Sequence, residues 1–266
     1  MPLSVDDRPP RDRAIRTVHT ALDLGITLID TADAYCIGAD DVGHNERLVA
    51  EAVRGWRGDS DTVVIATKGG HTRAGDGSWG LNGSPEYLRR ACEASLRALG
   101  TDTIELYQFH RPDPAVPLAE SVGALADLQR EGKVRMIGVS NFDVDGIKEA
   151  QSVAPIVSVL NEFSPRFRTS RDEIDYCDAN GIAFLAWSPL GGMGAADSLA
   201  TRHPEFAAVA EECGSSPQQV ALAWELAQGS CVIPIPGASR PETITDSAGA
   251  TALQLTAAQR ERLDQA

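Results

Sequence analysis

The sequence predicts an α/β fold in which parallel strands are joined by helices. Short runs of β-branched and other apolar residues alternate with amphipathic segments along all 266 residues. Strands and helices that alternate in this way pair through right-handed crossovers into a parallel sheet. No Pro/Ser-rich linker or shift in composition divides the chain. We therefore expect one domain over residues 1–266.

Two architectures share this alternation, a closed (β/α)8 barrel of the TIM type and an open, doubly wound sheet. The open sheet ordinarily carries a GxGxxG loop directly after its first strand. The first expected strand is ITLIDT at 26–31, and no such loop follows it. This absence favours the barrel.

Periodicity and capping residues define the elements of the first half. The segment 12–24 spaces its apolar residues three and four apart and stops at Gly25, as helices prefer. Asn45 is the expected N-cap of a helix over 45–54, and Ser84 with Pro85 opens a helix that stops at Gly100. The other elements expected here are strands at 26–31, 62–68, 104–110 and 134–140, and helices at 118–131 and 144–151.

The second half continues the same pattern. A glycine-rich loop, GGMGAAD at 191–197, interrupts it once. The expected strands are 156–160, 182–187 and 231–235, and the expected helices are 171–179, 204–212, 217–228, 241–248 and 257–263. The whole chain thus has seven expected strands.

Composition and charge exclude several classes of protein. Hydrophobic residues make up 42% of the chain, too many for a disordered protein, and aromatic residues only 5%, so Ala, Val, Leu and Ile must build the core. The net charge of −14 argues against binding to nucleic acid or an anionic membrane, since both need a basic surface. The five cysteines are scattered without a CxxC pair, which predicts neither disulfides nor a metal site.

Neither a signal peptide nor a stretch of the roughly 20 apolar residues that span a bilayer is recognisable. We expect a cytoplasmic protein that is a monomer or a weak homo-oligomer.

Chemically capable side chains follow one strand after another. In a barrel, the carboxyl ends of the strands meet at one mouth, where active sites lie. Taken singly, each side chain has a structural explanation, such as a solvated charge at a loop edge or an N-cap for the next helix. Their occurrence at successive strand ends favours a shared site. The residues are Asp30, Tyr35, Lys68, His110, Ser140, Asn141, Trp187 and Ser188.

The motifs around these residues resemble the aldo-keto reductase family in order and spacing. They are DTADAY at 30–35, VVIATKGG at 63–70, LYQFHRPD at 106–113 and IGVSNF at 137–142, followed by GHNERLVAEAV, NEFSPRFR, AWSPLGG and IPGASRPE elsewhere in the chain. The resemblance covers essentially the whole sequence. It implies a (β/α)8 barrel that binds NADPH without a Rossmann motif and reduces a small aldehyde or ketone.

The catalytic roles follow from the residue types. Reduction of a carbonyl needs an acid that protonates the forming alkoxide, and Tyr35 is the candidate. A free tyrosine has a pKa of about 10. We expect the Lys68 ammonium to bring that pKa nearer to neutrality, with Asp30 holding the lysine charged. His110 would donate a hydrogen bond to the carbonyl oxygen and orient it.

The resemblance also implies a set of cofactor contacts. Ser140 and Asn141 would bind the nicotinamide carboxamide, and Trp187 would stack on the nicotinamide ring. Ser239 and Arg240 suit the 2′-phosphate, because a guanidinium pairs with phosphate through two hydrogen bonds. Arg240 has an alternative explanation as a solvated arginine at a helix start. The remaining contacts would be Ser188, Leu190 and Gly192 at the pyrophosphate and Asp246 at the adenine.

Three departures from the family pattern stand out. Leu160 occupies the place of a glutamine that pairs with the carboxamide, and Gly237 that of a lysine near the 2′-phosphate. Only MPLSVDDR precedes the first helix, so the barrel is expected to lack its N-terminal hairpin and first strand. Its seven strands would then be split between 27–30 and 232–235, with these edges covered by the N-terminal segment, water or a partner chain.

These departures keep a second function open. A cofactor-binding protein without turnover, like the barrel-shaped β-subunits of potassium channels, is favoured by the missing strand and by Leu160. The intact set of Asp30, Tyr35, Lys68 and His110 favours the enzyme. The substrate would be selected by the loops 69–83 (with Trp79), 163–170 and 191–203.

Overall fold

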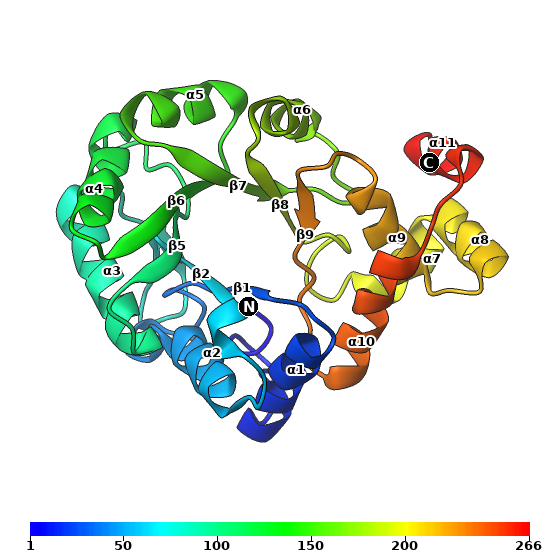
Figure 1. The fold of residues 1–266 in the computed structure, drawn as a ribbon, viewed down its shortest axis with the longest axis horizontal. Helices are drawn as coiled ribbons and strands as arrows, with labels where there is room; N and C mark the ends of the chain where they lie inside the picture. The colour runs from blue at the N-terminus through cyan, green and yellow to red at the C-terminus, as the bar shows by residue number, and fades with distance from the viewer. The chain divides into compact units, whose positions relative to one another are not determined.

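The computed structural model describes all 266 residues. The chain forms two compact units, and Figure 1 labels its helices and strands along the ribbon. The first comprises residues 1–159 together with 238–241, and the second comprises 160–237 together with 242–266. None of the helices has the length and apolar composition that crossing a bilayer requires.

The first unit alternates strands and helices from its first helix onward. Its helices are α1 (Arg11–Asp23), α2 (His44–Gly55), α3 (Pro85–Leu99), α4 (Leu118–Arg130) and α5 (Val144–Val153). Its strands are β1 (Leu28–Asp30), β2 (Val64–Gly69), β3 (His71–Arg73), β4 (Trp79–Leu81), β5 (Ile104–Phe109) and β6 (Val134–Ser140), and β7 (Ile156–Glu162) runs from the first unit into the second.

The second unit is mostly helical. Its strands are β8 (Ala183–Trp187) and β9 (Val232–Pro234). Its helices are α6 (Arg171–Asn180), α7 (Leu199–Arg202), α8 (Pro204–Cys213), α9 (Pro217–Leu226), α10 (Pro241–Gly249, whose first residue belongs to the first unit) and α11 (Ala257–Asp264).

The main sheet has seven strands in the order β1-β2-β5-β6-β7-β8-β9. The pairs β1–β2, β2–β5, β5–β6 and β8–β9 are all parallel. The order follows the chain without the reversal that defines a doubly wound sheet, so the connection pattern is that of a TIM-type barrel. This confirms the predicted fold class and the count of seven strands. It also confirms that β1 and β9, the two ends of the order, are the strands with one neighbour each.

The N-terminal segment packs on the elements next to β1. Val18, Val49 and Val63 belong to a buried cluster formed by α1, α2 and the residues preceding β2, and Leu3 and Ile29 pack against that cluster. Burial of these apolar side chains holds α1 and α2 beside the first two strands. The first part of the chain thus covers apolar surface near β1 without adding a strand.

One expected cap is wrong, one expected cap is confirmed, and an alternative explanation of two site residues as caps is excluded. Gly43, with φ at +79°, precedes the first residue of α2, so Asn45 is not the N-cap. Asp143 caps α5 by accepting a hydrogen bond from the Gly146 amide, which removes the explanation of Ser140 and Asn141 as caps. Ser84 caps α3 as expected.

A small antiparallel sheet of β3 and β4 was not anticipated in the loop after β2. Thr72 pairs with Gly80 at its centre, and Arg73 pairs with Trp79. The Arg73 guanidinium lies 4.1 Å from the centre of the Trp79 ring and donates hydrogen bonds to the carbonyl oxygens of Cys36 and Ile37. These contacts join the hairpin to the loop after β1.

In the second unit, α9 carries a fully buried glutamate. Glu225 has no exposed surface, and neither of its carboxyl oxygens has a hydrogen-bond partner. Burial raises the pKa of Glu225 well above its usual value. The group is therefore held as a neutral acid on a helix whose other buried residues are all apolar, among them Val220, Leu222 and Trp224.

Glu225→Leu is expected to stabilise the protein, and more so at alkaline pH. An acid whose pKa is raised by folding contributes stability below its unfolded pKa of about 4.3, and this contribution is lost as pH rises toward the folded pKa. Removing it should increase the free energy of unfolding at pH 8 by about 1–3 kcal/mol and by less at pH 5, measured by urea denaturation. Glu211→Leu, at an exposed position of α8, serves as the control. An equal gain at both pH values would contradict the argument.

Candidate active site

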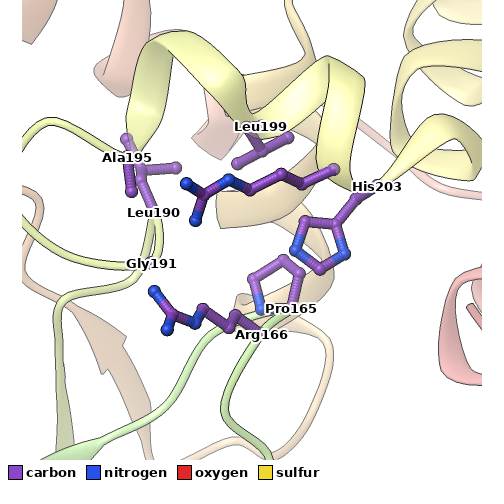
Figure 2. Close-up of a pocket in the computed structure, with 8 residues that line it drawn as sticks. Pro165, Arg166, Leu190, Gly191, Ala195, Leu199 and His203 are labelled. Carbon is purple, nitrogen blue, oxygen red and sulfur yellow. The ribbon is translucent and has the colours of Figure 1, made fainter.

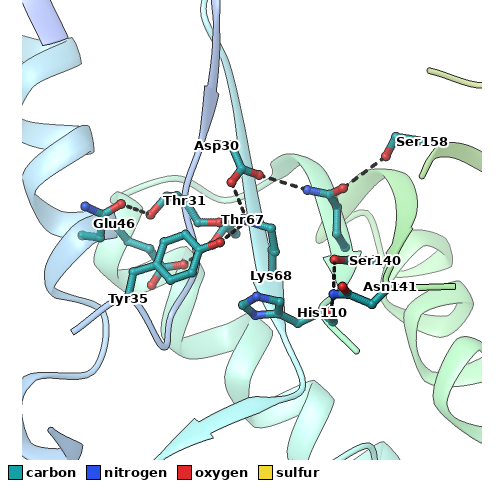
Figure 3. Close-up of polar contacts among 12 residues, drawn as sticks. Asp30, Thr31, Tyr35, Glu46, Thr67, Lys68, His110, Ser140, Asn141 and Ser158 are labelled. Carbon is teal, nitrogen blue, oxygen red and sulfur yellow. Dashed lines mark hydrogen bonds and ion pairs between the residues drawn. The ribbon is translucent and has the colours of Figure 1, made fainter. Parts of the chain in front are cut away.

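The catalytic candidates of the first unit lie together at the carboxyl ends of its parallel strands. Asp30 is the last residue of β1, Lys68 is the next-to-last residue of β2, and His110 directly follows β5. The register puts them on one face of the sheet, staggered by two residues from strand to strand, because Asp30 pairs with Ala66 and Lys68 pairs with Gln108. Tyr35 comes from the loop after β1. Figure 3 shows these four side chains converging around the Lys68 amine.

The Lys68 ammonium is fully buried, and all three of its protons are donated. Nζ lies 2.6 Å from Asp30 Oδ2, 2.8 Å from the Thr31 carbonyl oxygen and 3.0 Å from the Tyr35 hydroxyl. An ammonium has no acceptor, so the Tyr35 oxygen accepts in this contact. The phenol proton is therefore not used by Lys68 and remains available to a further acceptor.

A second layer of polar groups holds Asp30. Gln108 Nε2 donates to Asp30 Oδ1 at 3.3 Å, and Ser158 Oγ donates to Gln108 Oε1 at 3.4 Å. Gly138 lies between these strands, and a Cβ there would collide with the Ser158 hydroxyl and Gln108 Cγ. The glycine thus leaves the space in which the glutamine bridges Asp30 and Ser158 (Figure 3).

The surroundings of Tyr35 and Lys68 raise the pKa of both groups, but for different reasons. Desolvation raises the pKa of Tyr35 above 10, and this outweighs the lowering by Lys68. For Lys68, burial favours the neutral amine, but the charge and hydrogen bonds of Asp30 and Tyr35 outweigh it and the pKa is raised. Lys68 thus lowers the pKa of Tyr35 as expected, but the expected net shift toward pH 7 is wrong, because desolvation outweighs the effect of the lysine. At neutral pH the site holds a protonated phenol beside a charged ammonium.

His110 is a neutral imidazole next to that phenol. Its ring centre lies 5.7 Å from that of Tyr35 in an edge-on arrangement. Burial, helped by the charge of Lys68, lowers the pKa of His110 well below 6.5. Nδ1 is buried without a partner, whereas Nε2 forms no hydrogen bond and keeps some exposed surface. The accessible nitrogen of His110 is thus Nε2.

Ser140 and Asn141 lie beside His110 in the same unit. Asn141 adopts the left-handed conformation, with φ at +64°. Its Nδ2 donates to the His110 carbonyl oxygen at 3.1 Å and to Ser140 Oγ at 2.9 Å. Both protons of the amide are used, so Asn141 Oδ1 is left as an acceptor at this edge.

The predicted pyrophosphate residues Ser188, Leu190 and Gly192 lie in the second unit, where Leu190 lines a small pocket. Leu190 and Gly191 line it, together with the basic side chains of Arg166, Arg202 and His203. Figure 2 shows the Arg166 guanidinium and the His203 ring among the lining side chains. No acidic side chain lines the pocket. The loop before it is bent by three left-handed residues, Ser188, Gly191 and Gly192.

The other predicted cofactor residues have different surroundings. Trp187 ends β8, and its indole nitrogen is buried without a partner. Ser239 and Arg240 are exposed and lie in the first unit, directly before α10. Asp246, in the second unit, accepts hydrogen bonds from Ser216 Oγ and Gln219 Nε2, which ties α10 to the start of α9. Leu160 is buried in β7.

Two polar residues of the site escaped the sequence analysis. Gln108 lies two residues before His110 on β5, so both side chains share one face of the strand. A polar residue two positions before His110, on the same face of the strand, was the signal that could have identified it. His71 packs edge-on against His110, with ring centres 4.3 Å apart. Only the unanticipated β3–β4 hairpin brings it there.

Asp30→Asn is expected to destabilise the fold by about 3 kcal/mol, because it leaves a buried ammonium without its counter-charge. Urea denaturation at neutral pH measures the loss. The double variant Asp30→Asn, Lys68→Met removes the unpaired charge and should recover much of the stability. If the single variant unfolds like the wild type, the ammonium is not held by this ion pair.

Comparison with known proteins agrees with this geometry. The model of the Aldo/keto reductase family matches residues 3–266. The chain is 35% identical over 260 residues to an uncharacterized oxidoreductase of Schizosaccharomyces pombe, covering 98% of this chain and 81% of that protein.

Solved structures give the same result. A glycerol dehydrogenase from Gluconobacter oxydans superposes with a TM-score of 0.83 at 28% identity, over 97% of this chain and 86% of that one. An aldo-keto reductase from Klebsiella pneumoniae in complex with NADPH superposes with a TM-score of 0.79 at 30% identity, over 96% and 84%. These matches place the chain among oxidoreductases: it belongs to the aldo/keto reductase family.

Proposed function

We propose that this protein reduces an aldehyde or ketone to the alcohol, with NADPH as cofactor and Tyr35 as the proton donor. The observation that carries the proposal is the Lys68 contact with Tyr35, in which the phenol oxygen accepts at 3.0 Å and keeps its own proton free. A protonated phenol in a buried site is the acid that a forming alkoxide requires.

Each residue of the site has a distinct part in this reaction. Lys68 remains an ammonium, and its charge stabilises the phenolate that Tyr35 becomes after giving up its proton. Asp30 balances that charge, and Gln108 positions Asp30. His110 donates a hydrogen bond from Nε2 to the carbonyl oxygen, which orients and polarises the substrate.

The chain's own residues fit a nicotinamide dinucleotide phosphate, which supplies the hydride when bound. The free Asn141 Oδ1 suits the amide protons of the carboxamide, and Trp187, which is partly exposed, belongs to the set proposed for the nicotinamide ring. Arg166 and Arg202 line a pocket without acidic residues, a setting that suits the pyrophosphate. We propose Ser239 and Arg240 for the 2′-phosphate. The complex of the Klebsiella pneumoniae relative with NADPH supports this cofactor.

Other proposed contacts complete the site. Ser140 would bind the carboxamide beside Asn141, and Ser188, Leu190 and Gly192 would cover the pyrophosphate. For Asp246, a contact with the adenine would add to the hydrogen bonds it already accepts from Ser216 and Gln219.

The direct test is a panel of aldehydes and ketones incubated with the protein and NADPH, followed by loss of nicotinamide absorbance. Turnover of one or more carbonyls is expected. Tight binding of NADPH with no turnover across the panel would instead indicate a cofactor-binding protein without catalysis.

Tyr35→Phe is expected to abolish turnover and leave NADPH affinity within about twofold. The substitution removes the proton donor but keeps the ring, and a general acid contributes on the order of 10²–10⁴ to the rate. Steady-state kinetics give the rate, and a fluorescence titration gives the affinity. Reduction at the wild-type rate would contradict the assignment of Tyr35.

Arg240→Ala should weaken NADPH about tenfold and leave NADH unchanged, because only NADPH carries the 2′-phosphate. Arg202→Ala is the matched comparison and should weaken both cofactors alike, since both contain the pyrophosphate. Titration of each variant with each cofactor gives the four affinities. Equal losses for NADPH and NADH in Arg240→Ala would exclude its contact with the 2′-phosphate.

A further inference from the structure

Asn45 has a buried side chain that neither a helix cap nor the reaction described so far explains. It is the second residue of α2 and only 2% exposed, and Gly43 takes the N-cap position of that helix. A buried amide that makes no hydrogen bonds lowers stability, so the partners of this side chain show what it holds in place.

The hydrogen bonds of the Asn45 amide go to two hydroxyl groups without exposed surface. Asn45 Oδ1 accepts from Thr31 Oγ1 at 2.7 Å, and Asn45 Nδ2 donates to Ser4 Oγ at 2.8 Å. Ser4 Oγ also lies 2.7 Å from His44 Nδ1, which is the acceptor available to the Ser4 proton. The donors therefore all point one way, from Thr31 to His44, and hydrogen bonds in such a chain strengthen one another.

Thr31 is thereby held from two sides. Its amide donates to the Ala66 carbonyl oxygen on β2 at 2.8 Å, and its hydroxyl is bonded to Asn45 on α2. Fixing the nitrogen and the side chain of one residue leaves rotation about a single backbone bond to orient its carbonyl group. The Thr31 carbonyl oxygen accepts from Lys68 Nζ at 2.8 Å. A side chain of α2 thus helps to place one acceptor of the ammonium.

The place of this carbonyl matters because the Lys68 side chain has no exposed surface. Its three protons are donated to Asp30, to the Thr31 carbonyl and to Tyr35. Water cannot substitute for a displaced acceptor without entering the core, and a buried ammonium that loses a partner is costly. Displacing the Thr31 carbonyl would therefore turn the ammonium and disturb its contact with Tyr35.

We propose that Asn45 is a positioning residue that holds the Thr31 carbonyl oxygen on the Lys68 ammonium and thereby keeps the ammonium aligned with the Tyr35 hydroxyl. Asn45 acts through Thr31 and is not itself in contact with the reacting groups. The effect on the ammonium is independent of the reaction, whereas the effect on turnover rests on the proposed function.

The first measurement observes the ammonium directly. Protons of a buried and fully bonded NH₃⁺ group exchange slowly with water, so Lys68 should give a ¹H–¹⁵N signal at pH 7, unlike the more exposed Lys133 and Lys148. Lys68→Met identifies the signal by its loss. In Asn45→Ala the Lys68 protons should exchange about tenfold faster, because the Thr31 acceptor is displaced. A wild type without a slowly exchanging lysine signal would contradict the fully bonded ammonium and with it the proposal.

Variants of Thr31 separate this role from a general loss of packing. Thr31→Val keeps the shape but removes the hydroxyl and should accelerate exchange as Asn45→Ala does, whereas Thr31→Ser keeps the hydroxyl and should exchange as slowly as the wild type. The double variant Thr31→Val, Asn45→Ala should be no faster than either single variant, because both break the same bond. Should Asn45→Ala fail to fold, the comparison of Thr31→Val with Thr31→Ser decides.

Thr17→Val is the matched control. Thr17 is also buried, and its hydroxyl donates at 2.9 Å to the Arg13 carbonyl oxygen within α1. The substitution removes one buried hydroxyl from the same unit without touching the chain of bonds that ends at Lys68. Its exchange rate should equal that of the wild type, and faster exchange here would mean that any loss of packing loosens the ammonium.

Steady-state kinetics test the consequence for the proposed reaction. With a carbonyl compound that the wild type reduces, kcat should fall about five- to tenfold in Asn45→Ala and Thr31→Val, the effect of one lost hydrogen bond, while KM for NADPH stays unchanged. Thr31→Ser and Thr17→Val should keep the wild-type kcat.

The two measurements distinguish the two proposals. If exchange is accelerated as expected but no carbonyl is reduced even by the wild type, the proposed reaction fails and the positioning of the ammonium by Asn45 stands. Slow exchange in both Asn45→Ala and Thr31→Val would overturn the role of Asn45 whatever the turnover. So would accelerated exchange with kcat unchanged in an active enzyme.

Discussion

The site depends on one buried charge, the ammonium of Lys68. A lysine without exposed surface is stable in the charged form only if acceptors replace its water, and here Asp30, the Thr31 carbonyl and Tyr35 do so at 2.6–3.0 Å. Because the ammonium must donate to Tyr35, it also decides that the phenol oxygen accepts and keeps its proton. The same ion pair that allows the lysine to be buried therefore prepares the proton donor.

The surrounding polar groups show how far this arrangement extends into the first unit. Gln108 links Asp30 to Ser158, and Gly138 leaves the room for that link. On the other side, Thr31 donates to Asn45, which in turn donates to Ser4 near the start of the chain. A buried polar group that loses its hydrogen bond in such a network lowers the stability of the fold. The parallel strands bring the site residues together at their carboxyl ends, and these hydrogen bonds set the orientation of each side chain.

Burial decides the protonation of Tyr35 and His110, whereas at Lys68 the charge and hydrogen bonds of its neighbours outweigh burial. Tyr35 and His110 both favour their neutral forms, although Lys68 alone would pull the tyrosine the other way. In a low-dielectric environment, the loss of solvation competes directly with the nearest charge. A protonated Tyr35 and a neutral His110 whose Nε2 forms no hydrogen bond can both donate to the same oxygen atom. His71 differs from both. Its Nδ1 donates to the Gly80 carbonyl oxygen, so its Nε2 can only accept a hydrogen bond.

The sequence by itself determined the seven strands of the main sheet and their parallel order. It also identified Asp30, Tyr35, Lys68 and His110 as candidate site residues, because strand periodicity and the motifs at strand ends are local signals. It did not reveal Gln108 as a partner of Asp30, since that contact joins strands far apart in the chain. It gave the wrong direction for the Tyr35 pKa, because burial belongs to no single segment. The tertiary structure alone decided which atoms donate and accept around Lys68, and which nitrogen of each imidazole stays open. Those choices depend on distances and solvation that arise only when the strands are paired.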